Sequence, residues 1–321
     1  MGRYIARRLL WVVLVVVLVT FFTFVIFFVI PPIDPAILFA GRAPSERLIA
    51  QVREAFGLDQ PFWVQYGLFL KRIFLGDEYG WPGFGLSFVT RSPIREQFLD
   101  RTFVTAQLAI GGAVVWLVLG IFIGITSALK RGQWQDRVSM GFALFGVSAP
   151  VFWLGLMALY IFWEKLHWLP GTGYVPLSED PSQWFLHFLL PWVVLALLFA
   201  AFYARMVRGS LLESFGQDWM RTARAKGLSE RKVVYKHGLR ASLTPVVSMF
   251  GVDLGTLLGG AIITETVFNL PGLGTYVVRS VQSGDIPVIM DVVVFAGLAV
   301  ALMSLIADIL YAMLDPRVRY S

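Results

Sequence analysis

The side chains best suited to chemistry are few in this chain, and they are scattered. Cysteine is absent, which excludes thiolate nucleophiles, thiolate metal sites and disulfides together. The three histidines, His167, His187 and His237, have no paired spacing, so no metal site is expected. No Ser-His-Asp set and no nucleophile-elbow pattern gathers in one region, so no catalytic residues are predicted. What remains is a basic stretch and a small number of carboxylates near long apolar segments.

The basic stretch reads D-W-M-R-T-A-R-A-K-G from Asp218 to Gly227. Asp218 is a good N-cap and Gly227 a good C′ residue, which predicts a helix of about two turns between them. Ser229 predicts the start of a second helix, with Glu230 in its first turn. Isolated helices of this length are marginal in water, so the element needs a surface to pack against. Anionic lipid headgroups would explain the charge, but not the small residues.

A second pattern consists of small residues. Gly251, Gly255 and Gly259 recur every four residues, which predicts a ridge on one helix face that another helix can approach closely. Such a ridge serves either tight packing within the subunit or packing that changes as a pore opens. Asp253 lies off the ridge, and Asp308 lies near the end of the last apolar segment. For both carboxylates, solvated or Arg-paired structural roles are expected at least as much as substrate contact.

A third group of polar residues, Glu265, Asn269 and Asp285, surrounds the last short loop between apolar segments. One hypothesis is that they face the external mouth of a transport pathway.

The elements that must position these residues are membrane helices. Hydrophobic residues make up 57% of the 321 residues and charged residues 15%, against about 45–50% and about 25% in a soluble domain. A span needs about 20 apolar residues, and only helices are plausible inside it. Six segments qualify: Leu9–Ile30, Thr102–Leu129, Ser139–Trp163, Trp184–Met206, Val246–Val267 and Ile286–Leu314.

Lysine and arginine set the orientation of these spans. They concentrate at the N-terminus, in the second-to-third and fourth-to-fifth loops, and at the C-terminus, where Arg317 and Arg319 lie. All four segments fall on one side, so both termini are predicted to be cytoplasmic. Residues 31–101 then form an external region and residues 207–245 a cytoplasmic loop. The first apolar run is longer than a signal-peptide core and is predicted to stay as an anchor.

Several motifs in order along the chain carry a resemblance to a known family. The segments are Y-I-A-R-R-L-L at Tyr4–Leu10, F-G-L-D-Q-P at Phe56–Pro61, S-F-V-T-R-S-P at Ser87–Pro93, S-A-P-V-F-W-L-G at Ser148–Gly155, T-A-R-A-K-G-L at Thr222–Leu228, E-T-V-F-N-L-P-G-L-G at Glu265–Gly274 and A-M-L-D-P-R-V-R at Ala312–Arg319. With these segments, the chain resembles the first permease subunit of the ABC importers for dipeptides, oligopeptides and nickel.

The resemblance implies an all-α polytopic protein with the type I ABC importer permease fold, one permease domain over residues 1–321, in a bacterial or archaeal plasma membrane. It implies a second permease, two cytoplasmic ATPases and an external solute-binding protein as partners. No G-x-x-x-x-G-K-[ST] phosphate loop is present, so ATP and Mg²⁺ are expected on the ATPases and no cofactor on this chain. The residues expected to couple to the ATPases are Asp218, Arg221, Thr222, Ala223, Arg224, Ala225, Lys226 and Gly227.

The resulting hypothesis is a non-enzymatic transport subunit that forms half of the pathway for di- and oligopeptides. Nickel chelates and oligosaccharides are alternatives within the same machinery. A membrane-embedded enzyme would need polar groups converging at one depth, and no such set can be assembled. An autonomous channel would need its own selectivity ring, whereas the basic loop is typical of a docking element.

Overall fold

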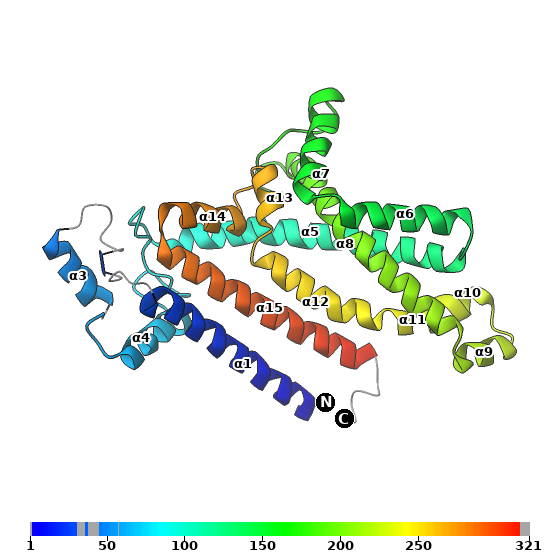
Figure 1. The fold of residues 1–321 in the computed structure, drawn as a ribbon, viewed down its shortest axis with the longest axis horizontal. Coiled ribbons are helices and arrows are strands. Elements are labelled where there is room, and N and C mark those ends of the chain that lie inside the picture. The colour runs from blue at the N-terminus through cyan, green and yellow to red at the C-terminus, as the bar shows by residue number, and fades with distance from the viewer. Residues whose placement is uncertain (1, 31–35, 38–44, 57, 315–321) are drawn as a thin grey trace.

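The computed structural model describes residues 2–30, 36–37, 45–56 and 58–314, and Figure 1 shows that this part of the chain is almost entirely helical. Arg317, Arg319 and the start of the predicted external region lie outside the described residues. The main elements are α1 (Gly2–Phe24) with the π-helical turn η1 (Val25–Val29), α3 (Glu46–Phe56), α4 (Phe62–Leu75), α5 (Ile94–Leu129), α6 (Trp134–Ser148), α7 (Val151–Ala158) with η2 (Leu159–Lys165), α8 (Pro181–Phe215), α9 (Asp218–Ala225), α10 (Glu230–Lys232) with η3 (Val233–Gly238), α11 (Leu239–Ser242), α12 (Thr244–Leu258), α13 (Ile262–Val267), α14 (Leu273–Ser283) and α15 (Ile286–Leu314).

Four predicted spans are confirmed as helices long and apolar enough to cross a bilayer. They are α1 with η1, α5, α8 and α15. The helices α5 and α8 contain 36 and 35 residues, more than the predicted apolar segments, because their polar ends continue the helix beyond the hydrocarbon region. Pro191 lies inside α8, where it removes one backbone hydrogen bond from the helix.

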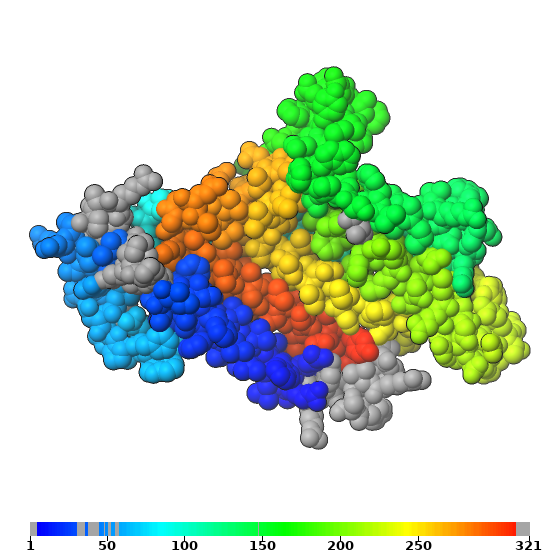
Figure 2. Space-filling model, in the orientation of Figure 1, coloured from blue at the N-terminus to red at the C-terminus, as the bar shows by residue number. Residues whose placement is uncertain are grey.

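The third predicted span is not one straight helix. α6 ends at Ser148, and the helix formed by α7 and η2 leaves it at an angle of 103°. Pro150 is the N-cap of α7, and Ala149 before it is extended, with φ −82° and ψ 128°. A residue that precedes proline is pushed out of the α region, so the sequence A-P at this point breaks the span. Figures 1 and 2 show the α7 and η2 segment projecting from the side of the molecule.

The fifth predicted span is also interrupted, and it is shorter than expected. α12 ends at Leu258, Gly260 adopts a φ of +127°, and the short helix α13 follows. At its other end, α12 meets the preceding helical segment at a bend of 47°, where Pro245 occupies the first turn of α12. The apolar run is therefore divided between α12 and α13.

The core joins the long helices pairwise. α5 packs along α8, and α12 packs along α15, with α1 on the outside of α15. Trp116 of α5 and Tyr203 of α8 are fully buried in the largest apolar cluster. In Figure 1 the helices α3 and α4 lie at one end of the long axis, while α9 and α10 lie at the other. This separation agrees with the predicted external and cytoplasmic sides.

Candidate functional site

The basic stretch folds as the first part of a helical hairpin, which we call the coupling-loop hairpin and define as Asp218–Ser242. Its first helix, α9, has the two turns that the caps predicted. Gly227 follows it with a φ of +73°, a conformation that glycine adopts without a steric cost. Asp218 is not the N-cap. Gln217 holds that position, and Asp218 lies one residue inside the helix with a side chain that is 96% exposed.

The hairpin has a small apolar interior of its own. Met220 is fully buried, Ala223 is 7% exposed, and both pack with Val233 of η3, against Phe215 at the end of α8. The structure shows that the small side chain of Ala223 faces the second half of the same hairpin. The role of Met220 was missed, although its spacing of three residues from Ala223 places both side chains on one helix face.

The opposite face of α9 is open to solvent. Trp219 is 40% exposed, and the predicted residues Arg221, Thr222, Arg224, Ala225 and Lys226 are all exposed. Thr222 donates a hydrogen bond from Oγ1 to the Asp218 carbonyl, at 2.9 Å. The exposed face therefore combines one aromatic side chain, several cations and small residues. The buried face of the same helix packs on Val233 and Phe215.

An ion pair between exposed side chains joins the first two helices of the hairpin. Arg224 donates two hydrogen bonds to Glu230, from Nε to Oε2 at 3.1 Å and from Nη2 to Oε1 at 2.8 Å. These bonds hold the pKa of Arg224 above its ordinary value. The bidentate geometry links α9 to α10. The sequence contained both residues, but it did not show that the turn at Gly227 brings them together.

The hairpin is joined firmly to the membrane helices. Gly238 lies where an added Cβ would be 3.1 Å from Leu211 of α8 and 3.2 Å from Met220. Ser242 Oγ donates to the Gly238 carbonyl at 2.9 Å and lies 3.4 Å from Ser214 Oγ of α8. The hairpin is therefore in contact with α8, and its last helix, α11, leads directly into α12.

A second ion pair, in which the carboxylate is buried, stabilises the same end of α8. Arg208 donates two hydrogen bonds to Asp136 of α6, at 2.8 and 2.9 Å. Asp136 also accepts from the Gly132 amide at 2.9 Å and from the Ser127 hydroxyl. This cluster was missed. The sequence feature that could have indicated this cluster is the single aspartate, Asp136, among the basic residues of the second-to-third loop.

The glycine ridge faces another helix of the same chain. An added Cβ at Gly251 would lie 2.4 Å from the Cβ of Ala307, one at Gly255 2.6 Å from the Cα of Val300, and one at Gly259 2.7 Å from the Cβ of Ala296. All three neighbours belong to α15, so the ridge permits close contact between α12 and α15.

The two carboxylates beside the ridge have partners. Asp253 accepts a hydrogen bond from the Tyr203 hydroxyl at 2.6 Å. Asp308 pairs with Arg8 at 2.9 Å. These contacts give both residues structural roles within the subunit.

The predicted external mouth is not assembled in this structure. Glu265 is fully buried and accepts hydrogen bonds from the Thr105 hydroxyl at 2.8 Å and the Thr275 amide at 2.9 Å. Asp285 is 4% exposed and accepts from Ser87 Oγ at 2.5 Å. Only Asn269 is exposed, at a φ of +51°. The sequence grouped these residues by loop position, whereas burial makes two of them internal hydrogen-bond acceptors.

Comparisons with known proteins agree with this architecture. Residues 120–320 match the family model described as "Binding-protein-dependent transport system inner membrane component", and residues 1–109 match the model for the N-terminal part of such membrane components. The chain is 41% identical over 321 residues to the glutathione transport system permease protein GsiC of Salmonella choleraesuis strain SC-B67, and both chains are covered completely. It is 35% identical over 320 residues to the probable peptide ABC transporter permease protein y4tP of Sinorhizobium fredii strain NBRC 101917 / NGR234, again with complete coverage of both.

A solved structure supports the fold. The MetNI methionine ABC transporter in an inward-facing conformation aligns with a TM-score of 0.57 at 20% identity, covering 69% of this chain and 98% of the other. The helical architecture and the two family matches lead to one conclusion: the chain belongs to the binding-protein-dependent transport system inner membrane components and is an ABC importer permease of the peptide branch with the type I fold.

Proposed function

We propose that this permease forms half of the translocation pathway of an ATP-driven importer for di- and oligopeptides. The coupling-loop hairpin is the observation that carries the ATP-driven part of the proposal. It presents an exposed helix face, supported by its own apolar interior and joined to α8 and α12. A short helix built in this way is suited to receive force from a partner and pass it into the membrane.

The partner proposed for this face is a cytoplasmic ATPase. Trp219 supplies a large rigid contact, of the kind enriched where partners bind tightly. Arg221 and Lys226 supply charge that steers association. Met220 and Ala223 then act from behind, by holding α9 in place. ATP and Mg²⁺ would bind the ATPases, because this sequence has no phosphate loop.

The remaining partners follow from the same proposal. A second, similar permease would complete the pathway, and an external binding protein would deliver the solute. The membrane would be the bacterial inner membrane, since the relatives reported above come from bacteria.

Glutathione is the second candidate substrate. It is a tripeptide, and the relative that shares 41% of its residues with this chain is named as a glutathione permease. Glutathione lies within the size range of the oligopeptide proposal, and both substrates would use the same coupling mechanism. Nickel chelates and oligosaccharides remain further candidates for the same test.

The test is reconstitution. The permease is co-expressed with its genomic neighbours, and the purified assembly is placed in vesicles with the matching binding protein. Uptake of labelled dipeptide, oligopeptide, glutathione, nickel chelate and oligosaccharide is then compared at equal concentration. We expect ATP-dependent uptake of peptides, lost when the ATPases are omitted. Uphill uptake by this chain alone would contradict the coupling proposal, and uptake of only non-peptide solutes would contradict the substrate proposal.

A further inference from the structure

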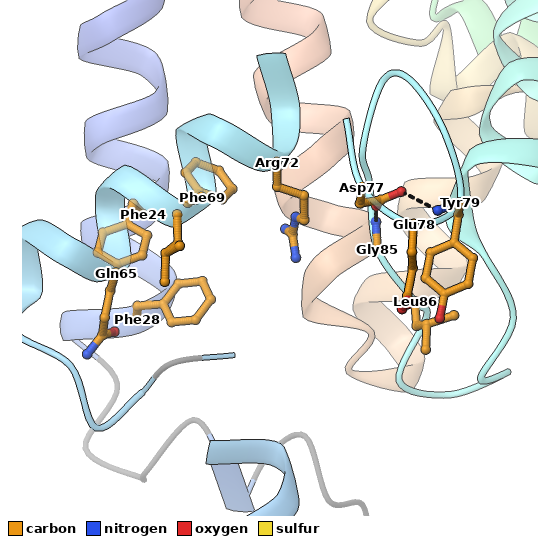
Figure 3. Close-up of a pocket in the computed structure, with 11 residues that line it drawn as sticks. Phe24, Phe28, Gln65, Phe69, Arg72, Asp77, Glu78, Tyr79, Gly85 and Leu86 are labelled. Atoms are coloured by element: carbon orange, nitrogen blue, oxygen red, sulfur yellow. Dashed lines mark hydrogen bonds between the residues drawn. The ribbon is translucent and has the colours of Figure 1, made fainter. Parts of the chain in front are cut away.

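A cavity of about 330 Å³ lies at the end of the molecule that we assign to the outside. Its walls come from the end of α1, from α4 and from the loop after α4 (Figure 3). One wall is apolar and aromatic, and the other carries polar side chains. The lining includes Phe24, Phe28, Phe69, Arg72, Glu78 and Tyr79.

Arg72 is the cation of this cavity, and Figure 3 shows its guanidinium group between the two walls. Its Nε is buried, and no residue that the structure describes forms a hydrogen bond with it. Among the described residues no carboxylate forms an ion pair with Arg72. The aromatic ring of Phe69 lies 5.8 Å from its guanidinium carbon. Asp291, which is 1% exposed on α15, interacts with Arg72 only through space. Desolvating part of a guanidinium without a bonded partner is costly, so the site favours an added acceptor.

The acidic side chains that line the cavity do not supply that acceptor. Asp77 uses both carboxylate oxygens on backbone amides, those of Tyr79 at 2.8 Å and Gly85 at 2.7 Å. Glu78 is exposed and lies beside the Tyr79 hydroxyl, where its carboxylate raises the pKa of that phenol. The cavity therefore offers a cation, Arg72, and a separate exposed anion, Glu78.

The position of the cavity indicates which ligand can reach it. α1 packs on α15 and α4 and lies at the edge of the bundle in Figure 1. Near Phe28, the side chains of α1 and η1 that point away from the bundle are apolar and exposed. The exposed fractions are 56% for Phe22, 50% for Ile26 and 53% for Val29. In a bilayer this face lies against acyl chains, and the end of α1 lies at the level of the headgroups.

We propose that this cavity binds the headgroup of a zwitterionic phospholipid, phosphatidylethanolamine, from the outer leaflet. Its phosphate accepts hydrogen bonds from Arg72, its ammonium group meets Glu78 and Tyr79, and its acyl chains follow the exposed face of α1. A bound lipid would tie α1 to α4 at the outer membrane surface.

Native mass spectrometry of the full-length chain tests this proposal, after purification in mild detergent and exchange into equal mixtures of phosphatidylethanolamine and phosphatidylglycerol. We expect Arg72→Gln to lower retained phospholipid about fivefold, the effect of one cation at a phosphate. Lys71→Gln is the matched control, because Lys71 is the exposed neighbouring cation on the same helix, and it should retain as much lipid as wild type. Equal retention by the two variants would overturn the proposal.

A second variant tests the headgroup without disturbing the cavity wall. Glu78 is exposed, so Glu78→Gln is expected to fold, and it should remove the preference for phosphatidylethanolamine over phosphatidylglycerol while keeping total retention. An unchanged preference would overturn the assignment of the ammonium site. Displacement of the lipid by the zwitterionic dipeptide glycyl-leucine, dependent on Arg72, would also overturn the proposal and indicate a substrate site.

Discussion

The two ends of this permease use charge in opposite ways. At the end that we assign to the cytoplasm, the charged side chains of α9 are exposed, and a few apolar residues behind them hold the helix in place. Towards the end that we assign to the outside, Glu265, Asp285 and Asp77 accept hydrogen bonds from amides and hydroxyls of their own chain. One end presents its charge at the surface, and the other uses charge to fix loops against the long helices.

This comparison depends first on which end lies on which side of the membrane. The chain lacks cysteine, so single-cysteine variants report one position each. Glu78→Cys should react almost completely with an impermeant thiol reagent added outside intact cells, whereas Ser229→Cys should react only after the cells are opened. Both positions are exposed. The reverse pattern would exchange the two ends.

The largest energetic effect is expected at the external end, from Glu265→Ala. The change leaves the Thr105 hydroxyl and the Thr275 amide without their acceptor in a buried site, at a cost of about 3 kcal/mol or more. We expect a melting temperature lower by about 5 °C or more, measured on purified protein. Glu164→Ala, at an exposed glutamate, is the control. Equal melting temperatures would show that Glu265 has no fixing role.

A smaller effect is expected at Ala223, and it separates the two faces of α9. Ala223→Trp overfills the contact with Phe215 and Val233, which costs about 1–3 kcal/mol, so amide hydrogen exchange in the hairpin should rise and ATPase association should fall. Trp219→Ala should weaken association without raising exchange, because Trp219 is exposed. Lys232→Gln should change neither. Unchanged exchange in Ala223→Trp would contradict the interior contact.

The turn at Gly227 should show an effect of about 1–2 kcal/mol. Its φ of +73° is unfavourable for a residue with a branched Cβ, so Gly227→Val should reduce transport per ATP hydrolysed in vesicles. An added Cβ meets no atom within 4 Å, so any loss comes from the backbone. Gly227→Asn tests this, since asparagine adopts the left-handed conformation more readily. If both variants behaved alike, the conformation of the turn would not be the cause.

The smallest effect is expected from Arg224→Gln, which removes the ion pair with Glu230. Both side chains are largely exposed, and such pairs contribute about 0–1 kcal/mol. Hairpin exchange should rise slightly in low salt and match wild type in high salt. A large loss of ATPase association that does not depend on salt would place Arg224 within the docking contact itself.

The sequence predicted the long helices well because hydrocarbon requires a minimum apolar length, which can be counted along α5 or α15. It did not predict the breaks at Pro150 and Gly260, because apolar composition continues through them while the backbone does not. The sequence also did not predict which face of a helix points into the protein. The helix containing Ala223 was predicted from its caps, but the side that faces inward depends on Val233, which belongs to another element.

The same limit explains the burial of Glu265 and Asp285, which the sequence did not predict. Glu265 and Asp285 are separated from their partners Thr105 and Ser87 by 160 and 198 positions. No local pattern reports contacts at that range. Polarity beside a loop therefore suggested exposure, where long-range packing produces burial.

The proline within α8 gives this helix a mechanical property. From Trp192 to Phe215 the helix continues for 24 residues, a rigid arm of ~36 Å at the rise of an α-helix. A rotation of about 10° at Pro191 would carry the far end of that arm through ~6 Å, about one helical turn. The hairpin is attached to that far end, so the arm converts angle into distance. A displacement of the hairpin by that distance therefore needs only a slight change in the tilt of α8.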